Sequence, residues 1–281
     1  MSAETLTVNG VDLATLVYLD ESPKLFTVPA RRGDNLVIPG RHGALKLPRK
    51  LFTTGEIILS MRILGHDPDQ PFPTGSAAPQ EFHDRADQVL RLFTAEQITI
   101  DHGRPDGSIR RAVGEVTDVL DLTRSGNGES AGKLSVSIEL TDPFWSDLFS
   151  VTAGPHLFST GGTQALTGFA GATAPMDELV VTFGPGSNPQ LTQPSSGYLL
   201  AYDGVISSGR ELQVNSGTWS VGSGSGTAWT PDVTKLRFGP ESRFFTLQPE
   251  PGGVAPTVRV THTGGGQMSV TLSGKRKYLT G

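Results

Sequence analysis

Residues 34–65 read DNLVIPGRHGALKLPRKLFTTGEIILSMRILG, and their pattern predicts three consecutive β-strands with no helix between them. An apolar run ends at Pro39-Gly40, where proline fixes φ at the first corner of a turn and glycine supplies the positive φ of a type II turn. We therefore expect a hairpin between residues 36–38 and 44–47. The aliphatic run at residues 56–64 predicts a third, longer strand.

The chain before this stretch also predicts strands. Asn9-Gly10 separates two short β-prone runs and is a strong signal for a tight hairpin, because both residues tolerate positive φ. Further β-prone runs lie at residues 16–19 and 25–28. The first third of the chain is therefore predicted to be a β meander.

One helix is predicted, from about Pro79 to Thr94. Its apolar residues recur at the three-, four- and seven-residue spacings that place them on a single helical face: Phe82, Ala86, Val89, Leu90 and Phe93. The runs at 98–100, 109–116 and 134–140 then alternate at the period of a strand. We therefore expect this helix to pack across a sheet.

A change in composition near residues 148–155 predicts a domain boundary. Residues 1–150 carry 15 Lys/Arg and 21 Asp/Glu, a net charge of −6, whereas residues 151–281 carry 8 and 7, a net charge of +1. Glycine rises from 13 in the first segment to 22 in the second. We predict domains at 1–150 and 151–281, since 281 residues exceed the usual size of one core, and we expect 151–175 to be a connector with little to bury.

The second domain is predicted to be an antiparallel sandwich or jelly roll. Short β-prone runs recur there at close intervals, joined by Gly, Pro, Ser and Asn turns. The Gly/Ser run at 222–226 is expected to be a flexible tip between strands. No repeat of fixed length is visible, which disfavours a propeller or a solenoid.

The composition excludes several classes of function. The net charge of −5 provides no basic surface for binding nucleic acid, and the absence of cysteine rules out disulfides, thiolate catalysis and cysteine-based metal sites. No apolar run approaches the ~18 residues of a membrane span, and the first ten residues lack the features of a signal peptide. We expect no membrane association, no cofactor and no metal.

No motif predicts a catalytic centre. The six histidines lack metal-binding spacing and are expected at the surface or in turns: His42, His66, His83, His102, His156 and His262. The acid pairs Asp67/Asp69 and Asp142/Asp147 could serve a glycosidase, but a role in binding backbone amides of turns is commoner. Trp219, Trp229 and Tyr202 could line a sugar platform, although core or interface packing is the commoner use of such side chains.

Four sequence blocks together resemble the distal tail proteins of long-tailed, non-contractile bacteriophages. The blocks are V-N-G-V-D-L at 8–13, I-P-G-R-H-G at 38–43, E-L-T-D-P-F-W at 139–145 and K-R-K-Y-L at 275–279. The residues that carry the resemblance, all in structural roles, are Pro39, Gly40, Arg41, Gly43, Asp142, Pro143, Phe144 and Trp145.

The resemblance implies a mainly β protein. It would have a split-barrel-like ring, or belt, domain with one helix, followed by a galectin-like β-sandwich. It implies a non-enzymatic virion component, assembled in the host cytoplasm, that forms a hexameric ring at the tail tip. The ring would join the tail tube protein to the tail hub and other baseplate proteins, with DNA passing through its lumen without specific binding. The alternatives are a glycan-binding module with Trp219 and Trp229 as possible contacts and, third, an enzyme that cuts cell-wall polysaccharide. A domesticated phage-like particle is an equally compatible source.

Overall fold

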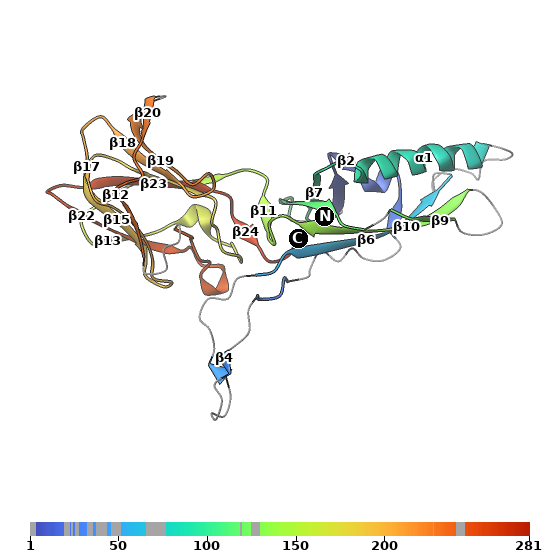
Figure 1. Ribbon diagram of the computed structural model, residues 1–281, viewed down its shortest axis with the longest axis horizontal. Coiled ribbons are helices and arrows are strands. Elements are labelled where there is room, and N and C mark those ends of the chain that lie inside the picture. The colour runs from blue at the N-terminus through green and yellow to red at the C-terminus, as the bar shows by residue number, and fades with distance from the viewer. Residues whose placement is uncertain are drawn as a thin grey trace. The chain divides into compact units, whose positions relative to one another are not determined.

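The protein divides into two compact β units, and each unit has its own core (Figure 1). The first unit is Met1–Trp145 with Leu279–Gly281, and the second is Ser146–Tyr278. The computed structural model describes residues 4–19, 23, 25, 28–32, 36–37, 44–45, 52–65, 77–118, 120–124, 130–226, 228–239 and 245–281. The chain therefore crosses between the units twice.

The main sheet of the first unit is antiparallel and has the order β2-β1-β7-β8-β10-β6-β3, with β9 also paired to β10 and β11 to β8. Strands β4 and β5 form a separate two-stranded sheet. Its elements are β1 (Thr5–Val8), β2 (Val11–Asp12), a 3-10 turn (Leu13–Thr15), β3 (Tyr18–Leu19), β4 (Leu36–Val37), β5 (Ala44–Leu45), β6 (Gly55–Leu64), α1 (Ala77–Phe93), β7 (Ile98–Gly103), β8 (Ile109–Val116), β9 (Leu122–Arg124), β10 (Ala131–Leu140) and the start of β11 (Trp145–Asp147). The sheet curls into a half-barrel.

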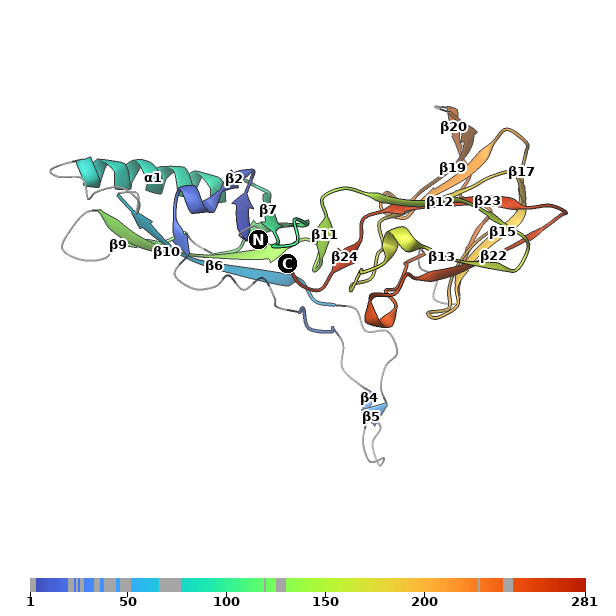
Figure 2. The same ribbon diagram turned by 180° about the vertical axis from the view of Figure 1, so that it is seen from behind.

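The helix α1 covers the apolar face of this sheet (Figure 2). Strands β6 and β10 pair along ten residues, from Gly55 opposite Leu140 to Leu64 opposite Ala131, and alternate residues of both strands are buried. Phe82 of α1 lies directly over Gly132, where an added Cβ would come within 3.1 Å of its ring. The buried residues alternate along β6 and β10, and the apolar residues of α1 recur along one helical face. The apolar face of the sheet and that of the helix therefore pack against each other.

Several predicted elements of the first unit are confirmed. Asn9 (φ 50°) and Gly10 (φ 81°) form a tight turn between β1 and β2. Strands β4 and β5 pair as the predicted hairpin, but its turn, with Pro39, Gly40, Arg41 and Gly43, lies outside the described residues. The helix begins slightly before its predicted start and ends one residue early. Strand β9 was not predicted, and the described residues of 25–28 are not in a strand.

The second unit is an antiparallel sandwich of two sheets, as predicted. One sheet has the order β12-β23-β14-β18-β19-β20, and the other has the order β13-β22-β15-β16-β21 with β17 on β15. The strands of the two sheets are β12 (Val151–Phe158), β13 (Gly162–Ala165), β14 (Leu179–Phe183), β15 (Gly186–Gln193), β16 (Tyr198–Tyr202), β17 (Val205–Ile206), β18 (Glu211–Asn215), β19 (Ser220–Ser225), β20 (Ala228–Pro231), β21 (Leu236–Phe238), β22 (Thr257–Thr263) and β23 (Met268–Gly274). The last strand, β24 (Lys277–Tyr278), lies outside these two sheets and pairs with β11. The 3-10 turns are Thr167–Phe169 and Pro251–Gly253. Side chains of both sheets form one continuous core.

Two predictions for the second unit are wrong. Residues 151–175 are not a connector, because they form β12, β13 and a 3-10 turn, and Phe158, Leu166 and Phe169 are buried in the core. Residues 222–226 are not a free tip, because most of them lie in β19 between β18 and β20. Residues 222–226 contain no β-branched residue, and in both segments pairing with neighbouring strands fixes the extended backbone. The unit also ends at Tyr278, since the last three residues return to the first unit.

Candidate functional site

One buried carboxylate ties the first strand of the second unit to its last. Asp147 Oδ2 accepts a hydrogen bond from Arg276 Nε at 2.6 Å, and Asp147 Oδ1 accepts one from the Tyr278 hydroxyl at 2.9 Å. The Asp147 amide also donates to the Arg276 carbonyl at 3.0 Å. Asp147 is only 9% exposed. We call Asp147, Arg276 and Tyr278 the Asp147 clasp.

Arg276 connects the clasp to a further segment of the second unit. Arg276 reaches further and donates to the Ala170 carbonyl at 3.2 Å, so it links a third segment of the same unit. Its hydrogen bond to Asp147 raises the pKa of the guanidinium, although burial acts in the opposite direction. Charge-assisted hydrogen bonds of this kind are about twice as strong as neutral ones.

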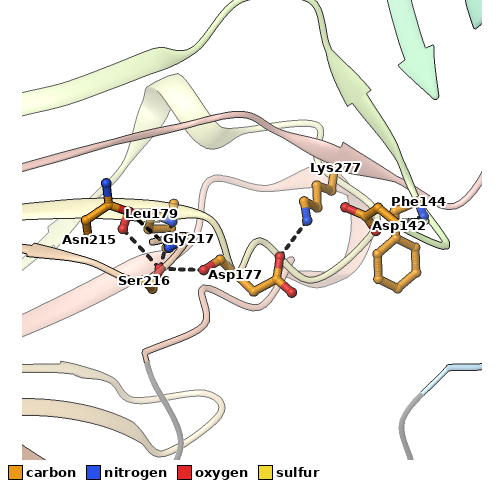
Figure 3. Close-up of polar contacts among 8 residues, drawn as sticks. All are labelled: Asp142, Phe144, Asp177, Leu179, Asn215, Ser216, Gly217 and Lys277. Carbon is orange, nitrogen blue, oxygen red and sulfur yellow. Dashed lines mark hydrogen bonds and ion pairs between the residues drawn. The ribbon is translucent and has the colours of Figure 1, made fainter. Parts of the chain in front are cut away.

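The neighbouring Lys277 is held in the same unit by a second ion pair (Figure 3). Its side chain is 3% exposed, and Nζ lies 2.5 Å from Asp177 Oδ1. The Lys277 carbonyl accepts hydrogen bonds from the amides of Thr173 and Ala174, each at 3.0 Å. Ser216 in turn donates to the Asp177 carbonyl. Three of the four residues of the K-R-K-Y block, Arg276, Lys277 and Tyr278, therefore bind acidic side chains of the second unit.

The D-P-F-W block closes the first unit. Asp142 Oδ1 accepts a hydrogen bond from the Phe144 amide at 3.1 Å, which forms an Asx turn. Phe144 packs edge-on against Phe52, with ring centroids 5.0 Å apart. Trp145 is buried, and an added Cβ on Gly281 would meet its ring at 2.8 Å. The motif therefore combines a turn former with two aromatic anchors.

The returning residues 279–281 are held within the first unit. Arg110 donates to the Thr280 carbonyl at 2.7 Å, and the Gly281 amide donates to the Leu25 carbonyl at 3.0 Å. His102 is buried close by, with its ring centroid 6.2 Å from that of Trp145. Both segments that connect the units are therefore fixed by hydrogen bonds and aromatic packing.

Burial lowers the pKa of His102. The carboxylate of Glu4, 4.0 Å from Nε2, and a backbone contact at Gly281 act in the opposite direction. The positive charges of Arg104 and Arg110 add to the lowering. His102 therefore takes up a proton only at a lower pH than a histidine in solvent does.

The face of the first sheet opposite α1 carries rows of like charge. Glu139 on β10 lies directly opposite Glu56 on β6 and Glu115 on β8, so three carboxylates stand side by side across three strands. Six residues along the ladder, Arg62 lies opposite Lys133. Like charges directly opposite each other in a sheet are destabilising. We call Glu56, Glu115 and Glu139 the glutamate row.

Of the two acid pairs considered for a glycosidase, only Asp142/Asp147 lies within the described residues, and its two members are not brought together in one site. Asp67 and Asp69 lie outside the described residues, and Asp142 and Asp147 belong to different units. The expectation of a turn role is correct for Asp142 but wrong for Asp147, whose carboxylate binds side chains. In the described ranges no group of three or more acidic or histidine side chains is placed to hold a metal.

The expectation for the histidines fails at two positions. His102 and His262 are buried in strands, because both lie on the core-facing side of the strand alternation. His83 and His156 are partly exposed, as expected for surface residues. His42 and His66 lie outside the described residues.

The two tryptophans considered for sugar binding lie in one sheet but have different environments. Trp219 is in the β18–β19 turn with a positive φ of 56° and is 70% exposed. Trp229 on β20 donates from Nε1 to the Gly226 carbonyl at 2.9 Å and covers Gly222 of β19. Tyr202 is buried, with its hydroxyl bonded to Asp232. The glycan contacts stay a prediction.

A solved structure matches nearly the whole chain. It is described as the crystal structure of the SPP1 Dit (gp 19.1) protein, a paradigm of the hub adsorption apparatus in phages that infect Gram-positive bacteria. The match has a TM-score of 0.60 with 14% sequence identity and covers 98% of this chain and 99% of that chain. The fold is that of a distal tail protein.

Comparison by sequence alone does not detect this relationship. No protein-family model matches the chain, and no curated protein matches it. Among the helices of the described residues, none has the length and apolar character needed to cross a membrane. The distal tail protein fold is therefore shown by the tertiary arrangement, and the sequence contributes only the resemblance of four short blocks.

The Asp147 clasp was not predicted from the sequence, although both of its segments had been singled out. Tyr278 lies in β24 and Arg276 directly precedes that strand, and residues two apart in extended backbone point to the same side, so both can bind one partner. That spacing was the available signal. The partner itself lies 129 residues away and required the topology.

Proposed function

We propose that this chain is a distal tail protein that forms a hexameric ring at the tip of a phage tail, or of a phage-like particle. The observation that carries the proposal is the match of fold over 98% of this chain and 99% of a known distal tail protein. Both units are covered, so the agreement extends beyond one common β module. The ring would be part of the virion and would assemble in the host cytoplasm.

The charge pattern supports a ring with a negative lumen. The glutamate row lies on the face that α1 leaves open, and the net charge of the chain is −5. Repeated around a ring, the row would present a band of carboxylates to passing DNA. Such a band repels phosphates, so DNA would slide without being held.

The Asp147 clasp supports a role in which the protein withstands mechanical force along the tail. A ring between the tail tube protein and the hub must hold its two units together when either end is pulled. The Asp147 clasp and the Lys277–Asp177 pair fix the ends of the second unit, while Trp145 and Arg110 fix the adjoining segments in the first. This pattern favours a structural adaptor over an enzyme, since the buried polar groups bind other protein groups.

Glycan binding by the second unit is the second candidate. The observation that favours it is Trp219, a large aromatic side chain 70% exposed at a hairpin turn. Exposed aromatics of this kind provide flat contact surfaces for sugars or for partner proteins. A glycan array would show a saturable signal that Trp219→Ala abolishes if this candidate is correct.

The ring can be tested directly with the purified chain. Light scattering coupled to size exclusion, followed by negative-stain imaging, is expected to show hexameric rings. A strictly monomeric protein at every concentration that can be reached would contradict the proposal.

The lumen assignment needs a second measurement. A variant with Glu56, Glu115 and Glu139 all changed to Lys is expected to form particles that retain DNA. The matched control reverses Glu81, Asp84 and Asp87 on the exposed side of α1, with a similar change in charge. Equal DNA retention by both variants would show that the glutamate row does not face the lumen.

A further inference from the structure

The second unit contains a polar pocket of about 350 Å³ that neither the ring nor the tryptophans explain. It opens between the β16–β17 turn and the segment that follows β20. Besides Ser223, its polar lining is Tyr202, Ser207, Arg210, Thr230, Asp232 and Lys235. Val205, Ile206 and Pro231 form its apolar walls. Pockets of this volume are at the small end of those that hold small molecules.

Asp232 provides a fixed acceptor at the base of this pocket. The Tyr202 hydroxyl donates to Asp232 Oδ2 at 2.5 Å, and Lys235 Nζ approaches the same oxygen at 4.0 Å. Burial, together with Asp232, raises the pKa of Tyr202 to about 12, so the phenol stays a donor. Within the described part of the chain, no donor is recorded for the other oxygen, Oδ1. That oxygen can accept a hydroxyl of a ligand.

Two cations stand at the rim. Lys235 lies over the Tyr202 ring, 5.8 Å from its centroid, with about half of its side chain exposed. Arg210 donates from NH2 to the Ser223 carbonyl at 2.9 Å, which orients a guanidinium whose five N–H donors are not exhausted by this bond. Two positive charges against one carboxylate make the mouth of the pocket net positive.

We propose that this pocket binds a small hydroxylated anion, such as one unit of a sugar acid or of a polyol phosphate. Arg210 and Lys235 would bind the acid group, since guanidinium and ammonium groups are the common ligands of phosphate and carboxylate. Asp232 Oδ1 and the hydroxyls of Ser207 and Thr230 would bind the ligand hydroxyls. The near-neutral charge of the second segment of the chain allows an anionic polymer to approach it, unlike the acidic first segment.

This inference does not depend on the ring, because the pocket lies entirely within the second unit. Loss of hexamers would leave ligand binding unchanged, and loss of ligand binding would leave the hexamers unchanged. The two proposals therefore fail separately.

Isothermal titration calorimetry on the full chain tests the proposal with four probes. Glucuronate and glycerol 3-phosphate are expected to bind saturably, and glucose and inorganic phosphate at least tenfold more weakly. A polymer of phosphodiester-linked glycerol, compared with free glycerol 3-phosphate, shows whether the natural source is a polymer. Three outcomes would each overturn the proposal. Glucose could bind as tightly as glucuronate, inorganic phosphate could bind as tightly as glycerol 3-phosphate, or neither glucuronate nor glycerol 3-phosphate could bind.

Variants then locate the binding. Arg210→Gln and Lys235→Gln are each expected to weaken glycerol 3-phosphate binding at least fivefold, and Asp232→Asn is expected to weaken it without affecting inorganic phosphate. Arg259→Gln, which removes an exposed cation of β22 that does not line the pocket, is the matched control and should change nothing. If Arg210→Gln and Lys235→Gln both bind as the unchanged protein does, or if an acidic peptide binds the pocket more tightly than either acid, the assignment is wrong.

Discussion

Changing Asp147 to Asn removes one charge from the centre of the clasp while keeping the shape of the side chain. The amide oxygen can still accept one hydrogen bond, from either Arg276 or Tyr278. The guanidinium of Arg276 then has no counter-ion at 2.6 Å, and its side chain is only 33% exposed. The second unit should therefore lose stability through an uncompensated, partly buried charge.

The expected loss is about 2–3 kcal/mol in the free energy of unfolding. Breaking one partner of a buried ion pair costs about 3–5 kcal/mol. Water reaches part of Arg276 and reduces this figure, while the weaker hydrogen bond to Tyr278 adds on the order of 1 kcal/mol. Asp203→Asn is the matched control, because Arg237 and Asp203 form the same type of pair at the surface, with side chains 58% and 47% exposed. Exposed pairs contribute about 0–1 kcal/mol.

Urea unfolding followed by circular dichroism measures the overall loss. Hydrogen exchange of residues 145–147 and 276–278 locates it, and exchange there should accelerate in Asp147→Asn and not in Asp203→Asn. Equal destabilisation by the two variants would refute the argument, since it would mean that burial of Asp147 contributes nothing. A loss below that of the control would refute it as well.

Three further predictions concern the first unit. The pKa of His102 is lower in the folded protein than in the unfolded chain. As the pH falls below about 6.5, His102 is therefore protonated in the unfolded chain before it is protonated in the folded protein. The free energy of unfolding should decrease over this range, until the pH reaches the pKa of His102 in the folded protein. His102→Gln should reduce this slope in urea unfolding at a series of pH values, and an unchanged slope would assign it to other groups. Glu139→Gln should stabilise the protein by about 0.5 kcal/mol at low salt, because it removes two like-charge neighbours; no gain, or a gain insensitive to salt, would count against the glutamate row. Gly132→Ala should destabilise by about 1–3 kcal/mol, because its Cβ would meet Phe82 at 3.1 Å, whereas Gly265→Ala, with open space around it, should have little effect. A thermal shift that is the same for both would show that α1 can move away from the sheet.

The elements that were predicted correctly from the sequence are those whose conformation is set by residues within the element itself. The Asn9-Gly10 turn needs only two residues that accept positive φ, and both do. The run at 56–64 and the helix at 77–93 each repeat their apolar residues at one period over many positions. The resemblance at residues 139–145 likewise depends on a local Asx turn and two aromatics. Such patterns can be interpreted without knowing the rest of the fold.

The elements that the sequence missed take their conformation from neighbours. Strand β19 is rich in glycine and serine and has weak β propensity of its own, yet it is paired on both sides. Residues 151–175 join the core because strands β22 and β23 lie beside them. The β propensity of a segment does not report which strands it will pair with.

The sequence by itself determined a mainly β chain with one helix, a change of character near residue 150 and the absence of cysteine chemistry. Only the tertiary structure brought Asp147 to Arg276, placed three glutamates in one row and gathered Tyr202, Asp232 and Lys235 around a pocket. The physical reason is the distance along the chain over which each interaction acts. Turn chemistry and periodicity act over a few bonds, whereas a charge pair or a pocket exists only after the sheets have closed and brought distant side chains within hydrogen-bonding distance.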